Sequence, residues 1–165
     1  MTDETPTEET VLLDEKREAL LAELSESLGE SLVESHLRPH EDLWLRVTAE
    51  SWQDSISTLR SAGFDYFGFL SAIDWDIAPE GRYENTEFDS GLEEEDDEPV
   101  EIDTSTGYGG GDSRFQILAQ LYSLNRQVGL ILKTDLGEDM TIETIRDVFP
   151  GADWHEREAH EMFGI

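Results

Sequence analysis

The sequence contains no cysteine, few basic residues and no long hydrophobic run. The absence of cysteine excludes disulfides, thiolate nucleophiles and cysteine-ligated zinc or iron–sulfur clusters within this chain. The best apolar run, residues 128–132, has the size of a strand and is too short to span a bilayer. The first residues are acidic and lack the basic and apolar regions of a signal peptide. These absences predict a chain that is soluble or bound peripherally to a membranous partner.

Charge of one sign dominates the composition. There are 40 acidic residues against 11 basic ones, so the formal net charge is −29. Such a field repels nucleic acid phosphates and anionic lipid, which argues against both as direct partners. A length of 165 residues with 37% hydrophobic content suits one globular domain plus polar sequence. We expect a disordered acidic tail over 1–10 and a single domain over 11–165.

Helical spacing of apolar residues marks four segments. The first begins at Thr10 and stops before Pro39. Its apolar positions are Leu13, Leu20, Leu21, Leu24, Leu28, Leu32 and Val33. Further helices are predicted over 51–62, over 139–149, and from Asp153 onward.

Strand-like segments alternate with these helices. They cover 43–47, 64–73, 114–122 and 127–133, and the short polar link between the last two favours a hairpin. Mixed hairpins and helices predict an α+β fold. It would have an N-terminal helix, then a mixed or antiparallel sheet with packed helices, and a long acidic disordered loop.

That loop is the acidic insertion over 76–112. It holds the unbroken acidic run 93–98 and then the glycine-rich stretch 107–111, and it is too polar to fold by itself, so we expect it to be mobile. The glycines superficially resemble a nucleotide-binding loop. They lack the third glycine of the dinucleotide pattern, a Walker lysine and a strand directly before them, so a phosphate site is not predicted.

Catalytic chemistry finds little support in the sequence. His155 and His160 are five residues apart and therefore point about 140° apart on a helix, which does not suit a metalloprotease-type metal site. His36 and His40 have the right spacing, but Pro39 breaks the helix that would align them. No nucleophile elbow is present. We predict no catalytic, cofactor-binding or metal-ligating residue.

The final helix nevertheless has an unusual surface. Trp154, Glu158 and Met162 fall on one stripe, which we expect to be its packed apolar face. A buried Glu158 would need donors from a nearby loop or an arginine. Alternatively, Glu158 and Arg157 would dock a partner subunit. Arg157 and Glu161 have the spacing of an ion pair on a neighbouring face.

The segment from Trp154 to Ile165 resembles the signature of one family, the C subunits of bacterial NADH-quinone oxidoreductase, the respiratory complex I. Its core is Glu-Arg-Glu, two residues, an acidic residue and then apolar ones, matched here by Glu156, Arg157, Glu158 and Glu161. The lead-in 149–154, the hairpin and the strand over 64–75 are also similar. The family signature continues past this point with a His-Pro and Arg-rich segment, so the resemblance implies an incomplete C-terminus.

The resemblance implies a peripheral-arm subunit on the cytoplasmic side of the cell membrane, packed against the subunit that forms the quinone pocket. Members of this family hold no cofactor, while FMN, iron–sulfur clusters and quinone belong to the rest of the enzyme. The isolated chain would be inactive. The implied interface residues are Trp154, Glu156, Arg157, Glu158, Glu161, Met162 and Phe163.

Three other interpretations remain open. Membrane-bound hydrogenases and complexes that oxidise other electron donors use similar subunits. A free-standing acidic interaction module would bind a basic partner through the tail and the acidic loop. A hydrolase using the terminal His and Glu residues would require a stoichiometric metal.

Overall fold

The computed structural model describes residues 14–76 and 106–165, and within them it shows an α+β fold, as predicted. The acidic tail and most of the predicted insertion lie outside the described residues. The helices are α1 (Glu15–Leu28), α2 (Trp52–Ser61) and α3 (Ala152–Phe163), with short 3-10 turns at Gly29–Ser31 and Ala49–Ser51. The strands are β1 (Leu32–His36), β2 (Leu43–Val47), β3 (Tyr66–Asp74), β4 (Phe115–Ser123) and β5 (Val128–Asp135).

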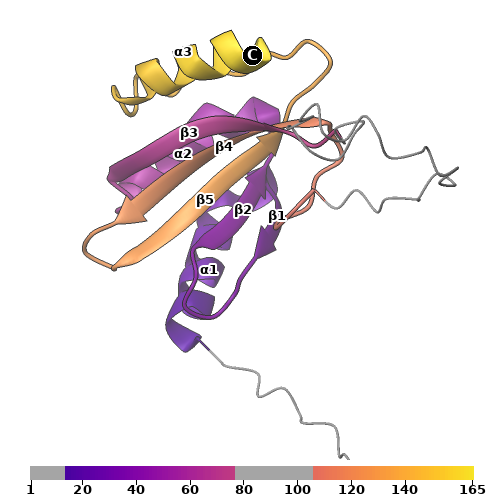
Figure 1. The fold of residues 1–165 in the computed structure, drawn as a ribbon. Coiled ribbons are helices and arrows are strands. Elements are labelled where there is room, and N and C mark those ends of the chain that lie inside the picture. Colours follow the sequence, from indigo (N-terminus) through magenta and orange to yellow (C-terminus); the bar gives the residue numbers. More distant parts are fainter. Residues whose placement is uncertain (1–13, 77–105) are drawn as a thin grey trace, which may run out of the picture.

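The five strands form one mixed sheet in the order β1-β2-β5-β4-β3 (Figure 1). Only the β2–β5 pairing is parallel, and the other three are antiparallel. The predicted hairpin is confirmed as β4 and β5, which lie between β2 and β3 in the sheet. β3 is therefore an edge strand of the described sheet, and α3 lies along it.

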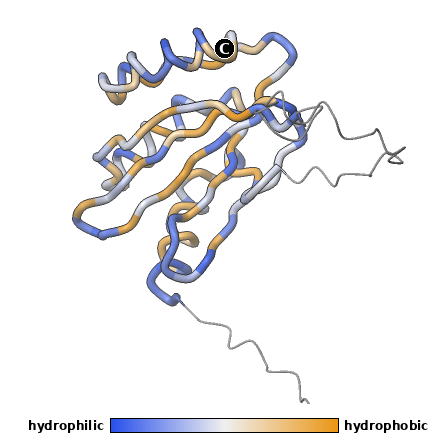
Figure 2. Tube along the Cα trace, viewed as in Figure 1, coloured by the Kyte–Doolittle hydropathy of each residue, from blue (hydrophilic) through white to orange (hydrophobic). Residues whose placement is uncertain are grey.

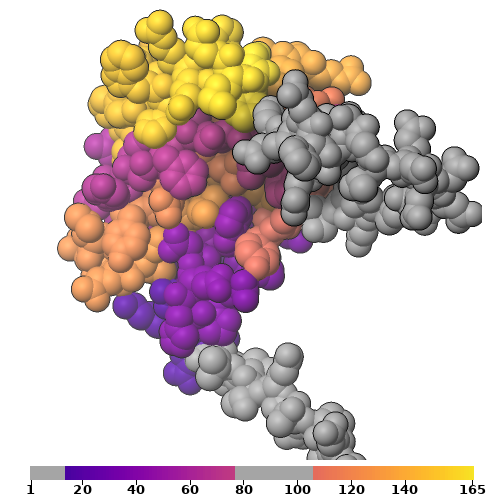
Figure 3. Space-filling view, in the orientation of Figure 1, coloured from indigo at the N-terminus to yellow at the C-terminus, as the bar shows by residue number. Residues whose placement is uncertain are grey.

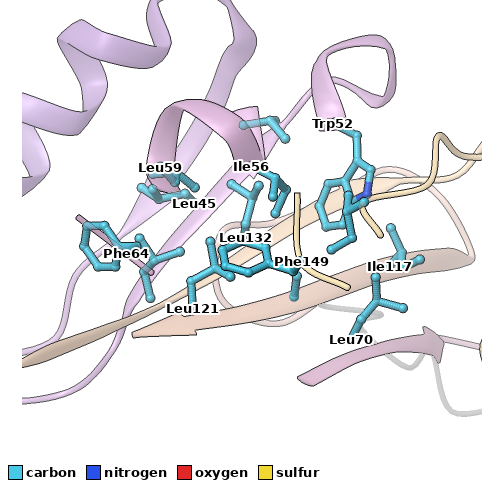
Figure 4. Close-up of a cluster of buried hydrophobic side chains, with 14 of the residues drawn as sticks. Leu45, Trp52, Ile56, Leu59, Phe64, Leu70, Ile117, Leu121, Leu132 and Phe149 are labelled. Carbon is cyan, nitrogen blue, oxygen red and sulfur yellow. The ribbon is translucent and has the colours of Figure 1, made fainter. Parts of the chain in front are cut away.

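The hydrophobic core lies between one face of the sheet and helices α1 and α2. Figure 4 shows Trp52, Ile56 and Leu59 of α2 near the strand residues Leu121 and Leu132. All five side chains are fully buried. Figure 2 shows the hydrophobic colour concentrated along the central strands, while the β4–β5 turn is hydrophilic. The apolar spacing of the sequence thus predicts this core correctly for α2 and the hairpin.

The first helix is shorter than predicted. It ends at Leu28 because Gly29 adopts a φ of +54° and donates its backbone N–H to the Ser25 carbonyl. Leu32 and Val33, expected on the helix, belong to β1 instead. The buried positions of α1 are Leu20, Leu24 and Leu28, which the helical spacing predicted.

The helix predicted over 139–149 is wrong. This segment is a loop that ends in a turn, in which the Phe149 N–H donates to the Ile145 carbonyl at 2.8 Å. Ile145 and Phe149 are nevertheless buried in the core. Their spacing imitates a helix because a loop that folds back on the sheet also buries residues three or four apart.

The opposite face of the sheet carries residues 106–111, which we call the strap. Arg46, Gln116 and Lys133 donate to strap carbonyls, those of Gly109, Gly110 and Thr106, at 2.8, 3.1 and 2.9 Å respectively. The Tyr108 ring stacks on His36 with 4.5 Å between centroids. This last part of the predicted insertion is thus held against the sheet by side chains of four strands.

Candidate interaction surface on the last helix

The last helix, α3, has well-defined ends. Pro150-Gly151 precede it, and Gly164 terminates it with a φ of +78° and an N–H donated to the His160 carbonyl at 2.9 Å. Only a residue that tolerates the left-handed region closes a helix in this way, which explains the glycine. The helix predicted from Asp153 is therefore confirmed.

The inner face of α3 is built from small residues. Ala152 and Ala159 are buried, two helical turns apart, and they allow the helix backbone to approach β3 closely. The His155 ring packs edge-on against Phe67 of β3, with 5.4 Å between centroids. Packing of α3 thus depends on shape complementarity at two alanines and one aromatic contact rather than on large apolar side chains.

Glu156 also faces inward, where it holds the loop that precedes α3. Its carboxylate accepts a hydrogen bond from the Thr144 hydroxyl and another from the Ile145 backbone N–H, each at 2.6 Å. The Thr144 carbonyl in turn accepts a hydrogen bond from the Gln53 side chain of α2 at 2.8 Å. A charged acceptor makes strong hydrogen bonds in this half-buried setting. We call this arrangement the Glu156 clasp.

The clasp borders a small cavity of about 130 Å³ beneath α3. Trp52, Leu70 and Ile142 contribute apolar walls, and Ile165 closes one side. Charged groups other than Glu143 and Glu156 are absent from this lining. The lining therefore contains no cation, and one of its two carboxylates, that of Glu156, is already engaged by the Thr144 hydroxyl and the Ile145 N–H.

The outer face of α3 carries the stripe that we expected to be packed, and this expectation is wrong. Trp154 is 73% exposed and Met162 is 69% exposed, with the exposed Glu158 between them. Figure 3 shows α3 in yellow at the top of the molecule, where its outward side carries no other described element. The helix packs against β3 through its alanines, so the side chains of Trp154 and Met162 remain accessible to a partner.

The polar contacts predicted for this helix differ from those observed. Glu158 has no hydrogen bond or ion pair within the described part of the chain, and Glu156 instead accepts from the nearby loop. Arg157 and Glu161 are both exposed, and no ion pair joins them among the described residues. Phe163, also predicted as an anchor, is half-buried.

The histidines do not converge. Besides the His155 contact with Phe67, the His160 ring nitrogen Nδ1 lies 3.0 Å from the Ile165 carbonyl oxygen. His36 stacks on the strap, and His40 lies in a loop with a φ of +65°. Within residues 14–76 and 106–165, no three His, Asp or Glu side chains are grouped so as to hold a metal ion. No helix in these ranges is long and apolar enough to cross a membrane.

The arrangement on α3 suits recognition rather than reaction chemistry. Tryptophan and methionine are enriched in the buried centres of protein–protein interfaces. Here an indole and a thioether stand about 12 Å apart along a rigid helix, with charged side chains around them. Sequence reasoning placed these residues on one stripe but expected that stripe to be packed. The spacing of seven between Ala152 and Ala159 is the signal that marks the packed side.

Residues 45–165 match the family described as respiratory-chain NADH dehydrogenase, 30 kDa subunit. The C subunit of the NADH-quinone oxidoreductase of Xanthobacter autotrophicus is 43% identical over 58 residues, which cover 35% of this chain and 28% of that protein. The protein of the same name from Rhodopseudomonas palustris is 40% identical over 62 residues, covering 38% and 30%. The matched segment thus spans less than a third of these relatives.

Two solved structures have the same fold. A trypsin-resistant fragment of Nqo5 superposes with a TM-score of 0.59 and 17% identity, covering 91% of this chain and 93% of that one. A chain of a membrane-bound sulfane sulfur reductase, an archaeal respiratory membrane complex, superposes with a TM-score of 0.62 and 19% identity, covering 92% and 69%. At these identities the likeness concerns the fold alone.

Proposed function

The chain belongs to the family of the 30 kDa subunit of respiratory-chain NADH dehydrogenase, and from that membership we propose that it is a subunit of an NADH-quinone oxidoreductase. The observation that carries the proposal is the family match over residues 45–165, which includes the hairpin, the Glu156 clasp and the exposed stripe of α3. Electron transfer from NADH to quinone, with coupled proton translocation, would be the activity of the whole assembly. The isolated chain would be inactive.

The role of the subunit would be to support assembly through the outer face of α3. Trp154 and Met162 would enter apolar pockets of a neighbouring subunit, the one that forms the quinone site. Glu158, Arg157 and Glu161 would pair with charged groups at the rim. The clasp supports this proposal, because a helix fixed to its own domain loses little conformational entropy on binding.

This chain would hold no cofactor itself. Iron–sulfur clusters need thiolate ligands in most proteins, and the sequence has no cysteine. FMN, iron–sulfur clusters and quinone would therefore be bound by partner subunits. The subunit would lie in the peripheral arm on the cytoplasmic side, with membrane contact made indirectly through its partners.

Affinity purification of the tagged full-length protein from gently solubilised membranes of its own organism tests the proposal. We expect flavin- and iron–sulfur-containing subunits to co-purify and the sample to reduce quinone with NADH. Co-purification with a hydrogenase or another donor-oxidising module would mean that the assembly takes its electrons from a donor other than NADH. Recovery as a lone protein would overturn the assembled-subunit proposal and favour the free-standing interaction module.

A further inference from the structure

A second cavity lies far from the proposed docking face, between α1 and the turn that joins β4 to β5. Its volume is about 310 Å³, which reaches the size range of small-molecule sites. Two contacts fasten its walls together. The Lys16 ammonium donates to the Arg126 carbonyl at 2.9 Å, and Arg126 pairs with Glu23 across the same gap. We call this space the α1–hairpin cavity.

Cations gather around the α1–hairpin cavity. Lys16, Arg17 and Arg126 line it, although the whole chain holds only 11 basic residues among 40 acidic ones. The single carboxylate of the lining belongs to Glu23. The lining residues, three cations and one carboxylate, therefore carry a formal charge of +2, opposite in sign to that of the chain as a whole. Repulsion from distant carboxylates is screened beyond about 8 Å at physiological ionic strength.

The three cations differ in the partners that they contact. Both terminal nitrogens of Arg126 contact the Glu23 carboxylate at 2.8 Å, and this hydrogen bonding holds the pKa of Glu23 below its usual range. Arg17 donates to the Asp14 carboxylate at 2.7 Å. Lys16, by contrast, has only a neutral carbonyl as its partner among the described residues. Its charge is therefore available to an incoming anion.

The inner surface of the cavity is apolar. Leu20 and Val128 are buried side chains that line it, and Ala19 adds a methyl group at an exposed position of α1. An apolar wall beside an ammonium that has no carboxylate partner among the described residues matches a ligand with a short hydrocarbon part and one negative charge. A bare inorganic anion would leave the apolar wall without contacts.

We propose that the α1–hairpin cavity binds a small amphipathic carboxylate, with its hydrocarbon part against Leu20 and Val128 and its carboxylate on the ammonium of Lys16. This inference is independent of the subunit proposal, since the cavity and α3 share no residue. The Lys16 ammonium would exchange its neutral carbonyl partner for a charged one, which makes a stronger hydrogen bond.

Titration of the full-length protein with hexanoate, butyrate and hexan-1-ol tests the proposal, with backbone amide NMR shifts as the readout. We expect hexanoate to shift the amides of Leu20, Arg126 and Val128. Each buried methylene strengthens binding about fourfold, so butyrate should bind at least about tenfold more weakly than hexanoate. Hexan-1-ol should also bind more weakly, because it lacks the charge.

Three variants complete the test. Lys16→Gln should weaken hexanoate binding about three- to tenfold. Arg146→Gln, which removes a charge from an exposed arginine elsewhere, should leave it unchanged. Ala19→Trp should abolish binding by filling the cavity from an exposed helical position while the helical content persists. The absence of shifts at the lining amides up to about 50 mM hexanoate, equal binding of hexan-1-ol, or equal effects of the two charge variants would overturn the proposal.

Discussion

The carboxylate of Glu156 accepts the backbone N–H of Ile145 at a distance of 2.6 Å, and this contact joins α3 to the loop that precedes it. Ile145 is fully buried, so the bond fixes both the loop and the orientation of the helix on the sheet. Because α3 is held in this way, Trp154 faces outward. The first acidic residue of the Glu-Arg-Glu motif is therefore engaged within the domain, while Arg157 and Glu158 beside it are exposed.

Removal of this carboxylate should destabilise the domain. Glu156→Ala leaves the N–H of Ile145 without its acceptor, and we expect the free energy of unfolding to fall by about 1–3 kcal/mol. Urea denaturation followed by circular dichroism measures this loss. Glu158→Ala, two residues along the same helix but exposed, should change the value by less than about 0.5 kcal/mol. Equal losses in the two variants would show that the Glu156 clasp does not stabilise the domain.

Gly111 of the strap must be glycine for two reasons, its positive φ and the lack of space for a Cβ. A comparison with Gly29, which has a positive φ but open space, separates the two reasons. Gly111 has a φ of +148°, and a Cβ there would collide with the Gln116 side-chain amide and lie 2.8 Å from an Asp135 carboxylate oxygen. Gly29 has a φ of +54° with open space around it. Gly111→Ala should therefore lower the free energy of unfolding by at least about 1 kcal/mol more than Gly29→Ala. Equal losses in the two variants would mean that the packing of the strap against Gln116 and Asp135 does not contribute to stability.

Lys133 should make stability depend on alkaline pH. Burial beneath the strap lowers the pKa of Lys133 from 10.5 to about 8, mainly because the ammonium loses its solvation. As pH rises through 8, the folded state releases this proton while the unfolded state keeps it until about 10.5. The free energy of unfolding should therefore rise between pH 8 and 10.5, by up to about 3 kcal/mol.

Lys133→Met isolates this contribution, since methionine fills a similar volume without an ionisable group. The Gln116 side-chain oxygen keeps the Trp75 indole N–H as a donor at 2.9 Å in that variant. Denaturation curves recorded between pH 7 and 10.5 should show the rise in the wild-type protein and its absence in the variant. Parallel pH profiles would show that Lys133 has the same pKa in the folded and unfolded states.

Elements with local signals could be predicted from the sequence. The β4–β5 hairpin and α2 combine the right periodicity with short connections, and both are confirmed. The helix predicted over 139–149 failed because its shape depends on a tertiary contact, the Glu156 clasp, that no local pattern encodes. Its β-branched residues, such as Thr144 and Ile145, also have weak helix propensity. The strap escaped prediction for the same reason, since its partners lie on four separate strands.

The orientation of α3 shows a second limit of prediction from the sequence. Hydrophobicity alone assigns Trp154 and Met162 to the packed face, yet the helix buries Ala152 and Ala159 instead. Small residues are needed there because the helix backbone lies close to β3. The sequence alone does not indicate how closely the two elements approach. The resemblance to the family singled out this segment, and the structure separates the inward Glu156 from the exposed residues around it.

The central claim is that the outer face of α3 docks this subunit onto its partners, and a double variant tests it most directly. Trp154→Ala with Met162→Ala removes both exposed anchors, while Val33→Ala with Leu124→Ala removes two other exposed apolar side chains. The yield of partner subunits co-purified with each tagged protein would be measured by quantitative mass spectrometry. We expect the α3 variant to lose at least about tenfold in yield, at unchanged unfolding free energy, and the control to retain it. Equal yields from the two variants would contradict the claim.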